Sequence, residues 1–163
     1  MGSIEVVDLN GNGPFTYNVD HFHFHAPAEH KFNGIRHELE MHIVHKIAAG
    51  PNYQNYKQQL GVIGILFRKS EKSHPFVQRL QIEDMGRIDY INLRNLFGLS
   101  RKEDDNENAH NFYHYHGSLT NPPCSDIVNW FILDDAIPIS EEHLEQFKDK
   151  WRCNIGHTNH RVC

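Results

Sequence analysis

Two segments in the first third of the chain alternate apolar and polar residues as β-strands do. A concentrated turn signal at residues 10–14 precedes the first segment, residues 15–24. A turn at Asn33-Gly34 leads into the second segment, residues 35–46. Because successive side chains of a strand point to opposite faces, each segment predicts a strand with two chemically different faces.

Later segments predict further strands and short helices. Residues 60–68 are a continuous apolar run of strand length, which is typical of the middle of a sheet. Pro75 suits the first turn of a helix over residues 75–85, and Ser140 suits the cap of a helix that runs to about Trp151. The other predicted elements are strands at 111–117 and 127–133, a short helix or loop at 54–59 and a solvated charged loop at 101–108.

The order of these elements indicates the fold class. Strands dominate and alternate with short helices, without regular βαβ units. We therefore expect a mainly β fold with short helices and a mostly antiparallel central sheet. The 163 residues, of which 39% are hydrophobic and 23% charged, suit one folded domain over residues 1–163.

Charge and hydropathy exclude two classes of partner. The formal net charge of −5 gives no electrostatic footprint for nucleic acid, and no apolar run is long enough to span a bilayer. Residues 1–5 lack the basic and apolar segments of a signal peptide, although a signal already cleaved stays open. The three cysteines form neither a CxxC pair nor a dense disulfide framework. A small-molecule substrate and a protein partner remain as the classes of partner to consider.

Histidines on the first two strands form a pattern typical of a metal site. His21, His23 and His25 share one face of the first strand, and His42 lies on the second strand with Glu40 on the same face. A catalytic zinc takes three protein ligands, commonly neutral imidazoles, and leaves one position for water. His23, His25 and His42 would hold one ion if the strands pair in a suitable register, with Glu40 orienting His42.

An alternative without metal is a half-buried strand whose histidines make ordinary hydrogen bonds. Several buried imidazoles would then leave costly unsatisfied polar groups, which favours the metal. Nine other histidines are assigned individually to the surface or to the support of ligands: His21, His30, His37, His45, His74, His110, His143, His157 and His160.

A second alternative is a cupin-like oxygenase that uses iron or manganese. His23, His25 and Glu29 have the spacing that opens that metal motif. The chain has no later Pro-x-Gly-x-x-His element, however, and the segment Thr120-Asn-Pro-Pro followed by Trp130 has no place in that motif. A cupin-like oxygenase is therefore a weaker hypothesis than the three-histidine zinc site.

A third motif is YHGSLTNPPC at residues 115–124, in which two prolines favour a rigid loop; by itself it is a turn between strands. Together with HFHFH at 21–25 and ELEMHIVH at 38–45, it resembles the α-class carbonic anhydrases from about Gly13 to Arg161. The resemblance implies Zn²⁺ held by His23, His25 and His42. It also implies supporting contacts from His21 to His23, from Glu40 to His42 and from the backbone carbonyl of Asn159 to His25.

The resemblance implies an enzyme, a lyase that reversibly hydrates CO₂ to bicarbonate and a proton. In that family a zinc-held hydroxide is the nucleophile, because the metal lowers the pKa of water from about 15.7 to about 7. Glu29 and Thr120 match the pair that orients this nucleophile. The residues that match the CO₂-holding wall are Val44, Val62, Leu119, Thr120, Val128 and Trp130.

The sequence departs from the family at several points. His21 stands where the family commonly has glutamine, and the family's amino-terminal part, with its proton-shuttle histidine, and its closing strand have no counterpart. We therefore expect a sheet that is incomplete at both ends, name no shuttle and expect self-association through an exposed edge. A zinc-binding protein that no longer turns over is the non-enzymatic alternative.

Cys124 matches a position that forms a disulfide in extracellular members of the family. That match favours secretion, while a buried free thiol and a cytoplasmic location stay open. Cys153 and Cys163 would pair with each other or with Cys124, and the sequence does not decide between these pairings.

Overall fold

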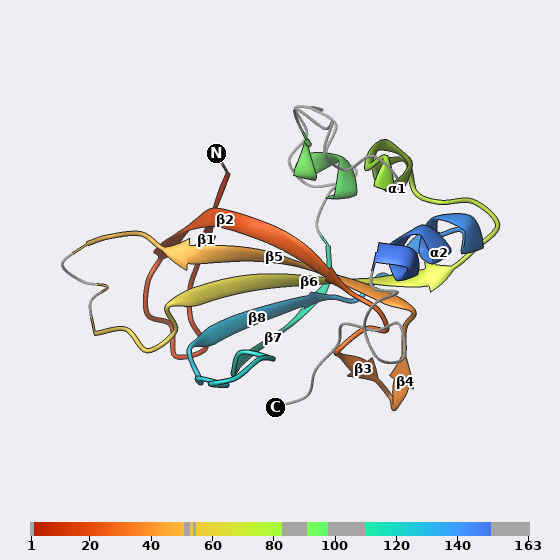
Figure 1. The fold of residues 1–163 in the computed structure, drawn as a ribbon. Helices are drawn as coiled ribbons and strands as arrows, with labels where there is room; N and C mark the ends of the chain where they lie inside the picture. Colours follow the sequence, from red (N-terminus) through yellow and green to blue (C-terminus); the bar gives the residue numbers. More distant parts are fainter. Residues whose placement is uncertain (1, 51–52, 54, 83–90, 98–109, 151–163) are drawn as a thin grey trace.

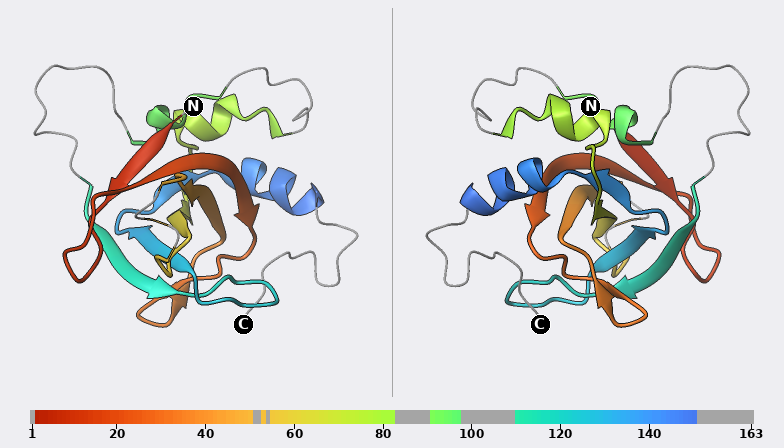
Figure 2. Two further views of the ribbon diagram at one scale, coloured as in Figure 1. Left: turned by 90° about the vertical axis from the view of Figure 1, so that its left-hand side faces the viewer. Right: turned by 90° about the vertical axis from the view of Figure 1, so that its right-hand side faces the viewer.

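A curled sheet forms the body of the protein (Figures 1 and 2). The computed structural model describes residues 2–50, 53, 55–82, 91–97 and 110–150. Along the sheet the strands follow the order β1-β2-β5-β6-β8-β7, and β9 pairs with β6. The strands are β1 (Ser3–Val6), β2 (Phe15–His25), β5 (Leu39–Ile47), β6 (Leu60–Lys69), β7 (Phe112–Gly117), β8 (Val128–Leu133) and β9 (Ile137–Ile139).

The pairing of the strands confirms a mainly β fold with a mostly antiparallel sheet. The pairs β1–β2, β2–β5, β5–β6 and β7–β8 are antiparallel, whereas β6 pairs in parallel with β8 and β9. The apolar run predicted at residues 60–68 is the central strand β6, as expected for a strand buried between neighbours. Strands β1 and β9 were not predicted, because each is too short for alternation to be visible.

The prediction of one continuous strand over residues 35–46 is wrong for its first residues. Residues Ile35–Arg36 form the short strand β4, which pairs with β3 (Lys31–Phe32) in a separate hairpin. The chain leaves that hairpin before it enters β5 at Leu39. The polar turn Asn33-Gly34 therefore connects the two short strands of this hairpin, and the long strand begins only after the hairpin.

The helices are short, and one is shorter than predicted. Helix α1 (Pro75–Arg79) begins with the expected proline, but it ends before the predicted boundary at 85, with residues 83–90 outside the described part. Helix α2 (Glu141–Lys150) begins after Ser140, whose carbonyl oxygen accepts from Leu144 N–H at 3.0 Å. Among the described residues, a 3₁₀ helix, η2, spans Leu93–Phe97. Trp151 and the charged segment 101–108 also lie outside the described residues.

Apolar side chains cover both faces of the sheet. On one face, Met41 and Ile65 pack with residues of α1 and α2, and the ring of Phe24 lies 4.6 Å from that of Phe147 in α2. On the other face, Val44 and Trp130 belong to a second apolar cluster. The histidines at 23, 25 and 42 share this second face, which the helices leave open.

Candidate metal centre

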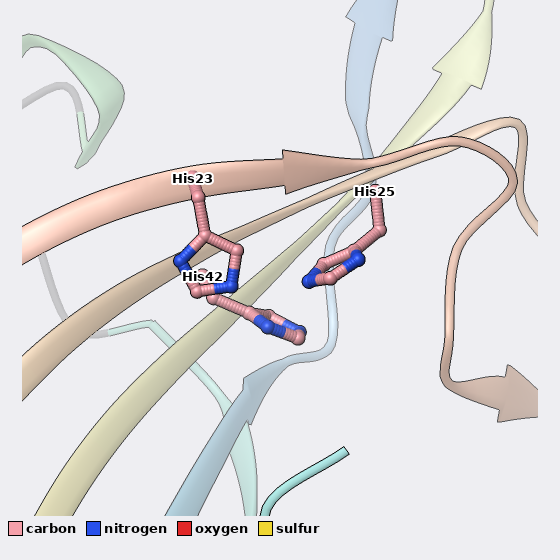
Figure 3. Close-up of side chains that lie close together, drawn as sticks. All are labelled: His23, His25 and His42. Carbon is pink, nitrogen blue, oxygen red and sulfur yellow. The ribbon is translucent and has the colours of Figure 1, made fainter. Parts of the chain in front are cut away.

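The register of β2 and β5 brings the three predicted ligands together. His23 lies directly opposite His42 in the antiparallel pair, and His25 lies opposite Glu40. Ring nitrogens of His23, His25 and His42 lie within 4.8 Å of one another. Figure 3 shows the three rings on one side of the two strands, close enough to share one ion. The register that the sequence left open is therefore one that suits a three-histidine site.

Two of the three imidazoles are buried, and the surroundings of the third, His23, favour its neutral form. His42 and His25 are only 2% and 4% exposed. Burial, and after it repulsion between like charges from the neighbouring His42 and His25, together lower the pKa of His23 to about 3. A metal ion binds the neutral imidazole, and three clustered imidazoles are a donor set that Zn²⁺ prefers.

Glu40 holds the third histidine in one orientation. Its carboxylate is fully buried, and Oε1 accepts a hydrogen bond from Nε2 of His42 at 2.7 Å. Since Nε2 of His42 carries the proton, Nδ1 is the atom left for a metal. Burial raises the pKa of Glu40, but hydrogen bonds from His30 and His42 outweigh burial and hold it well below its usual range.

A glycine in β6 makes room for this carboxylate. Gly64 lies opposite His42, and a Cβ atom there would stand 2.6 Å from Cδ1 of Ile132 and 3.2 Å from Oε1 of Glu40. Contacts this short force neighbouring side chains to move. The absence of a side chain at Gly64 thus keeps Glu40 beneath the imidazole of His42.

We predict that Gly64→Ala destabilises the protein by about 1–3 kcal/mol, the usual range for overpacking a core, and weakens zinc binding. Urea unfolding and chelator competition measure the two effects. Gly61→Ala is the matched control, because its Cβ would come no closer than 3.3 Å to a neighbour and would not approach Glu40. Equal zinc affinity in the two variants would contradict the role given to Gly64.

A cavity of about 240 Å³ opens beside the ligands. His23 and His42 contribute to its lining, and the rest is largely apolar. Nε1 of Trp130 donates to the carbonyl oxygen of Ser118 at 3.1 Å, which ties the loop after β7 to the cavity floor. All six residues predicted for the CO₂-holding wall line this cavity: Val44, Val62, Leu119, Thr120, Val128 and Trp130.

The structure places the other predicted site residues as follows. Oε1 of Glu29 lies 3.4 Å from Nδ1 of His25, and Thr120 lines the cavity. That Glu29 and Thr120 together orient the nucleophile stays a prediction. His21 stacks on His23 with ring centroids 5.2 Å apart, while its Nδ1 is bonded to Asp20 at 2.7 Å. Asn159 lies outside the described residues.

Sequence reasoning missed the individual roles of His30 and Tyr115 near the site and of His45 on the other face of the sheet. His30 contacts Glu40 and Tyr115, and the second contact could not be read from spacing, because Tyr115 lies 85 residues further on. His45 is buried at 4% exposure against backbone carbonyls of Ile43 and Gly61, contrary to the surface or supporting role expected. Because side chains alternate along a strand, His45 lies on the face opposite His42, and the structure shows it buried there.

Cys124 is disulfide-bonded, which rules out the free thiol that the sequence left open. The other two cysteines, Cys153 and Cys163, lie outside the described residues. Cys124 belongs to the loop that carries Thr120, and its N–H donates to the carbonyl oxygen of Asn121 at 2.9 Å. The disulfide therefore restrains the loop on one side of the cavity.

Comparison with known proteins places this geometry in a family. The sequence profile described as "Eukaryotic-type carbonic anhydrase" matches residues 3–162. The chain belongs to this carbonic anhydrase family. Alpha carbonic anhydrase 3 of Arabidopsis thaliana is 32% identical over 83% of this chain and 46% of its own length. Human carbonic anhydrase 6 is 29% identical over 89% of this chain and 49% of its own length.

Solved structures of carbonic anhydrases share the fold. Cah3 of Chlamydomonas reinhardtii, in complex with acetazolamide, superposes with a TM-score of 0.68 at 28% identity, over 92% of this chain and 62% of that one. The α-carbonic anhydrase of Thermovibrio ammonificans, in complex with the inhibitor sulfanilamide, gives 0.66 at 29% identity, over 91% and 59%. The chain spans about half the length of the curated relatives it matches. None of the described helices is long and apolar enough to cross a bilayer.

Proposed function

We propose that the protein is a zinc-dependent carbonic anhydrase that reversibly hydrates CO₂ to bicarbonate and a proton. The observation that carries this proposal is the convergence of three imidazoles, from His23, His25 and His42, at the side of a largely apolar cavity. When bound there, zinc would supply Lewis-acid activation of water near neutral pH. Membership of the carbonic anhydrase family supports this choice among zinc chemistries.

The chain's own residues would position the reactants. Val62, Val128 and Trp130 give the cavity an apolar wall on which CO₂ can rest without competing for polar groups. The hydroxyl of Thr120, on the same cavity, would orient the attacking water, and Glu29 would fix that hydroxyl as its hydrogen-bond acceptor. Buried Glu40 would keep His42 in the tautomer that presents Nδ1.

Metal analysis and stopped-flow CO₂ hydration on the same sample test the proposal. We expect one zinc per chain and hydration above the buffer rate that acetazolamide suppresses. Stoichiometric zinc with hydration at the buffer rate would contradict the enzymatic function and leave the zinc-binding alternative. Iron in place of zinc would instead support the oxygenase reading.

The depressed pKa of His23 predicts a pH-dependent stability of the metal-free protein. Between pH 6.5 and about 3 the unfolded chain binds a proton at His23 that the folded chain does not, so the free energy of unfolding falls as pH falls. The slope is at most about 1.4 kcal/mol per pH unit from this residue. Urea titrations with a chelator at pH 7.5, 6 and 5 measure the slope.

The control for this prediction is His23→Gln, which keeps a polar side chain at the same position but does not titrate. Its slope over the same pH range should be shallower than that of the parent protein. Equal slopes in the two proteins would show that other groups set the pH dependence.

We propose that the protein also self-associates through β7, which ends one side of the described sheet. The strand carries no charged residue or proline to discourage pairing, and Phe112 and Tyr113 are 54% and 53% exposed. Light scattering should therefore give a mass above that of one chain at high concentration. Phe112→Lys should reduce this mass, whereas a monomer at every concentration would contradict the proposal.

We propose an oxidising location, such as the extracellular space, because Cys124 is disulfide-bonded. Disulfides persist in secreted proteins and are rare in the cytosol. Thiol titration of protein isolated from its native source, with thiols blocked at lysis, should find Cys124 oxidised. A reduced Cys124 in that material would favour the cytoplasm.

A further inference from the structure

A chain of hydrogen bonds runs from the last strand of the sheet to the third metal ligand. The hydroxyl of Tyr115 in β7 lies 2.6 Å from Nε2 of His30. Nδ1 of His30 lies 2.5 Å from Oε1 of Glu40, the same oxygen that contacts Nε2 of His42 at 2.7 Å. The four residues belong to β7, to the segment between β2 and β3, and to β5. One oxygen of Glu40 therefore joins two imidazoles.

With a neutral imidazole at His30, each hydrogen bond in this chain has one consistent direction. An ionised carboxylate accepts and never donates, so Nδ1 of His30 and Nε2 of His42 both donate to Glu40. A neutral His30 that donates through Nδ1 must accept through Nε2, so the Tyr115 hydroxyl donates to it. Burial raises the pKa of Tyr115, which keeps this hydroxyl protonated. Tyr115 thus selects the tautomer of His30 that bonds to Glu40.

Packing holds His30 in the plane that these bonds need. Its ring centroid lies 4.9 Å from Trp130 and 6.0 Å from His42, and its side chain is 16% exposed. The other oxygen of Glu40, Oε2, accepts from the backbone N–H groups of Glu29 and His30 at 2.8 and 2.9 Å. The backbone therefore fixes Oε2, and the His30 side chain acts on Oε1, which faces the metal ligand.

We propose that His30 and Tyr115 are positioning residues that tune the zinc affinity of the site through Glu40. The proposal rests on the zinc site proposed above. Without the His30 donor, Oε1 of Glu40 loses one of its two imidazole partners and is free to tilt away from His42. His42 then presents Nδ1 less often in the direction that zinc requires, and the metal leaves faster. Metal retention is thus partly set at the outer strand β7.

Four variants of the whole chain test this proposal by chelator competition and by the rate of zinc release. His30→Leu removes both hydrogen bonds and should weaken zinc binding by roughly 10-fold, the lower end of the range for groups that support metal ligands. His30→Asn places an amide N–H near Nδ1 and should recover most of that affinity. Tyr115→Phe should weaken binding by about 3-fold. Tyr113→Phe is the matched control, because its hydroxyl has no hydrogen bond within the described residues.

The same variants separate positioning from simple destabilisation. In the His30→Asn background, Tyr115→Phe should have no further effect on zinc affinity, because the amide no longer bonds to Tyr115. The visible spectrum of the Co²⁺-substituted protein should change in His30→Leu and not in Tyr113→Phe. Urea unfolding of each metal-free variant reports its folding independently of metal.

The outcomes distinguish this inference from the proposed function. Parent protein that binds no zinc would overturn the zinc site itself and with it this inference. Parent protein that binds zinc, with His30→Leu and Tyr115→Phe folded and releasing it at the parent rate, would overturn the inference alone. Weakening by Tyr115→Phe that persists unchanged in the His30→Asn background would show that Tyr115 does not act through His30.

Discussion

Replacing His42 by alanine is expected to abolish stoichiometric zinc binding and to reduce CO₂ hydration to the buffer rate. The ring of His42 has its centroid 5.2 Å from that of His23 and 4.7 Å from that of His25, and its Nε2 bonds to buried Glu40. If the three ligands share a binding free energy on the order of 10–16 kcal/mol, losing one weakens affinity by roughly three orders of magnitude. Zinc content after dialysis and stopped-flow hydration measure the result.

His110→Ala is the control for this variant. His110 is an exposed histidine whose Nε2 lies 2.9 Å from the carbonyl oxygen of Phe97, and it does not line the cavity beside His42. It should leave both zinc content and hydration unchanged. Full zinc occupancy in His42→Ala would show that the metal binds elsewhere in the protein.

Glu40→Gln is expected to weaken both the fold and the metal site. The Glu40 carboxylate accepts four hydrogen bonds, two from backbone N–H groups and two from His30 and His42. An amide replaces one acceptor oxygen by an NH₂ group, which then faces N–H donors. We expect the free energy of unfolding to fall by about 1–3 kcal/mol, the cost of leaving a buried polar group without its hydrogen-bond partner. Zinc affinity should fall by about 10–100-fold.

The matched control is Glu38→Gln, which makes the same chemical change two residues earlier, at a position that is only partly buried. Urea unfolding and chelator competition on both variants should show a large effect at Glu40 and almost none at Glu38. Similar zinc affinity in Glu40→Gln and in the parent protein would remove Glu40 from the metal site.

The pattern of the sequence predicts the ligand strands because their alternation is strict. Spacing alone could place His23 and His25 on one face of the first strand, and the structure sets His42 on the paired strand beside them. The register that sets His23 opposite His42 could not be predicted, since pairing depends on contacts along the whole of β2 and β5. Glu40 could be chosen as the partner of His42 because both lie on one strand face.

Contacts between distant segments account for what the sequence did not reveal. The bond between His30 and Tyr115 spans 85 residues, and the space at Gly64 depends on Ile132 in another strand. The parallel pairing of β6 with β8 is equally invisible to local patterns, because both strands are simple apolar runs. The wall of the cavity was identified only through the family resemblance, since its apolar residues look like ordinary core.

The three metal ligands and the apolar wall of the cavity differ in the length of the loop that must close before their residues meet. His23 and His42 meet across the antiparallel pair β2–β5, which closes a loop of fewer than 20 residues, whereas Val62 and Trp130 meet across the parallel pair β6–β8. Closing a longer loop costs more entropy and is slower. During folding, the ion-binding half of the pocket can thus form early, and a captured ion would then template the later arrival of the wall.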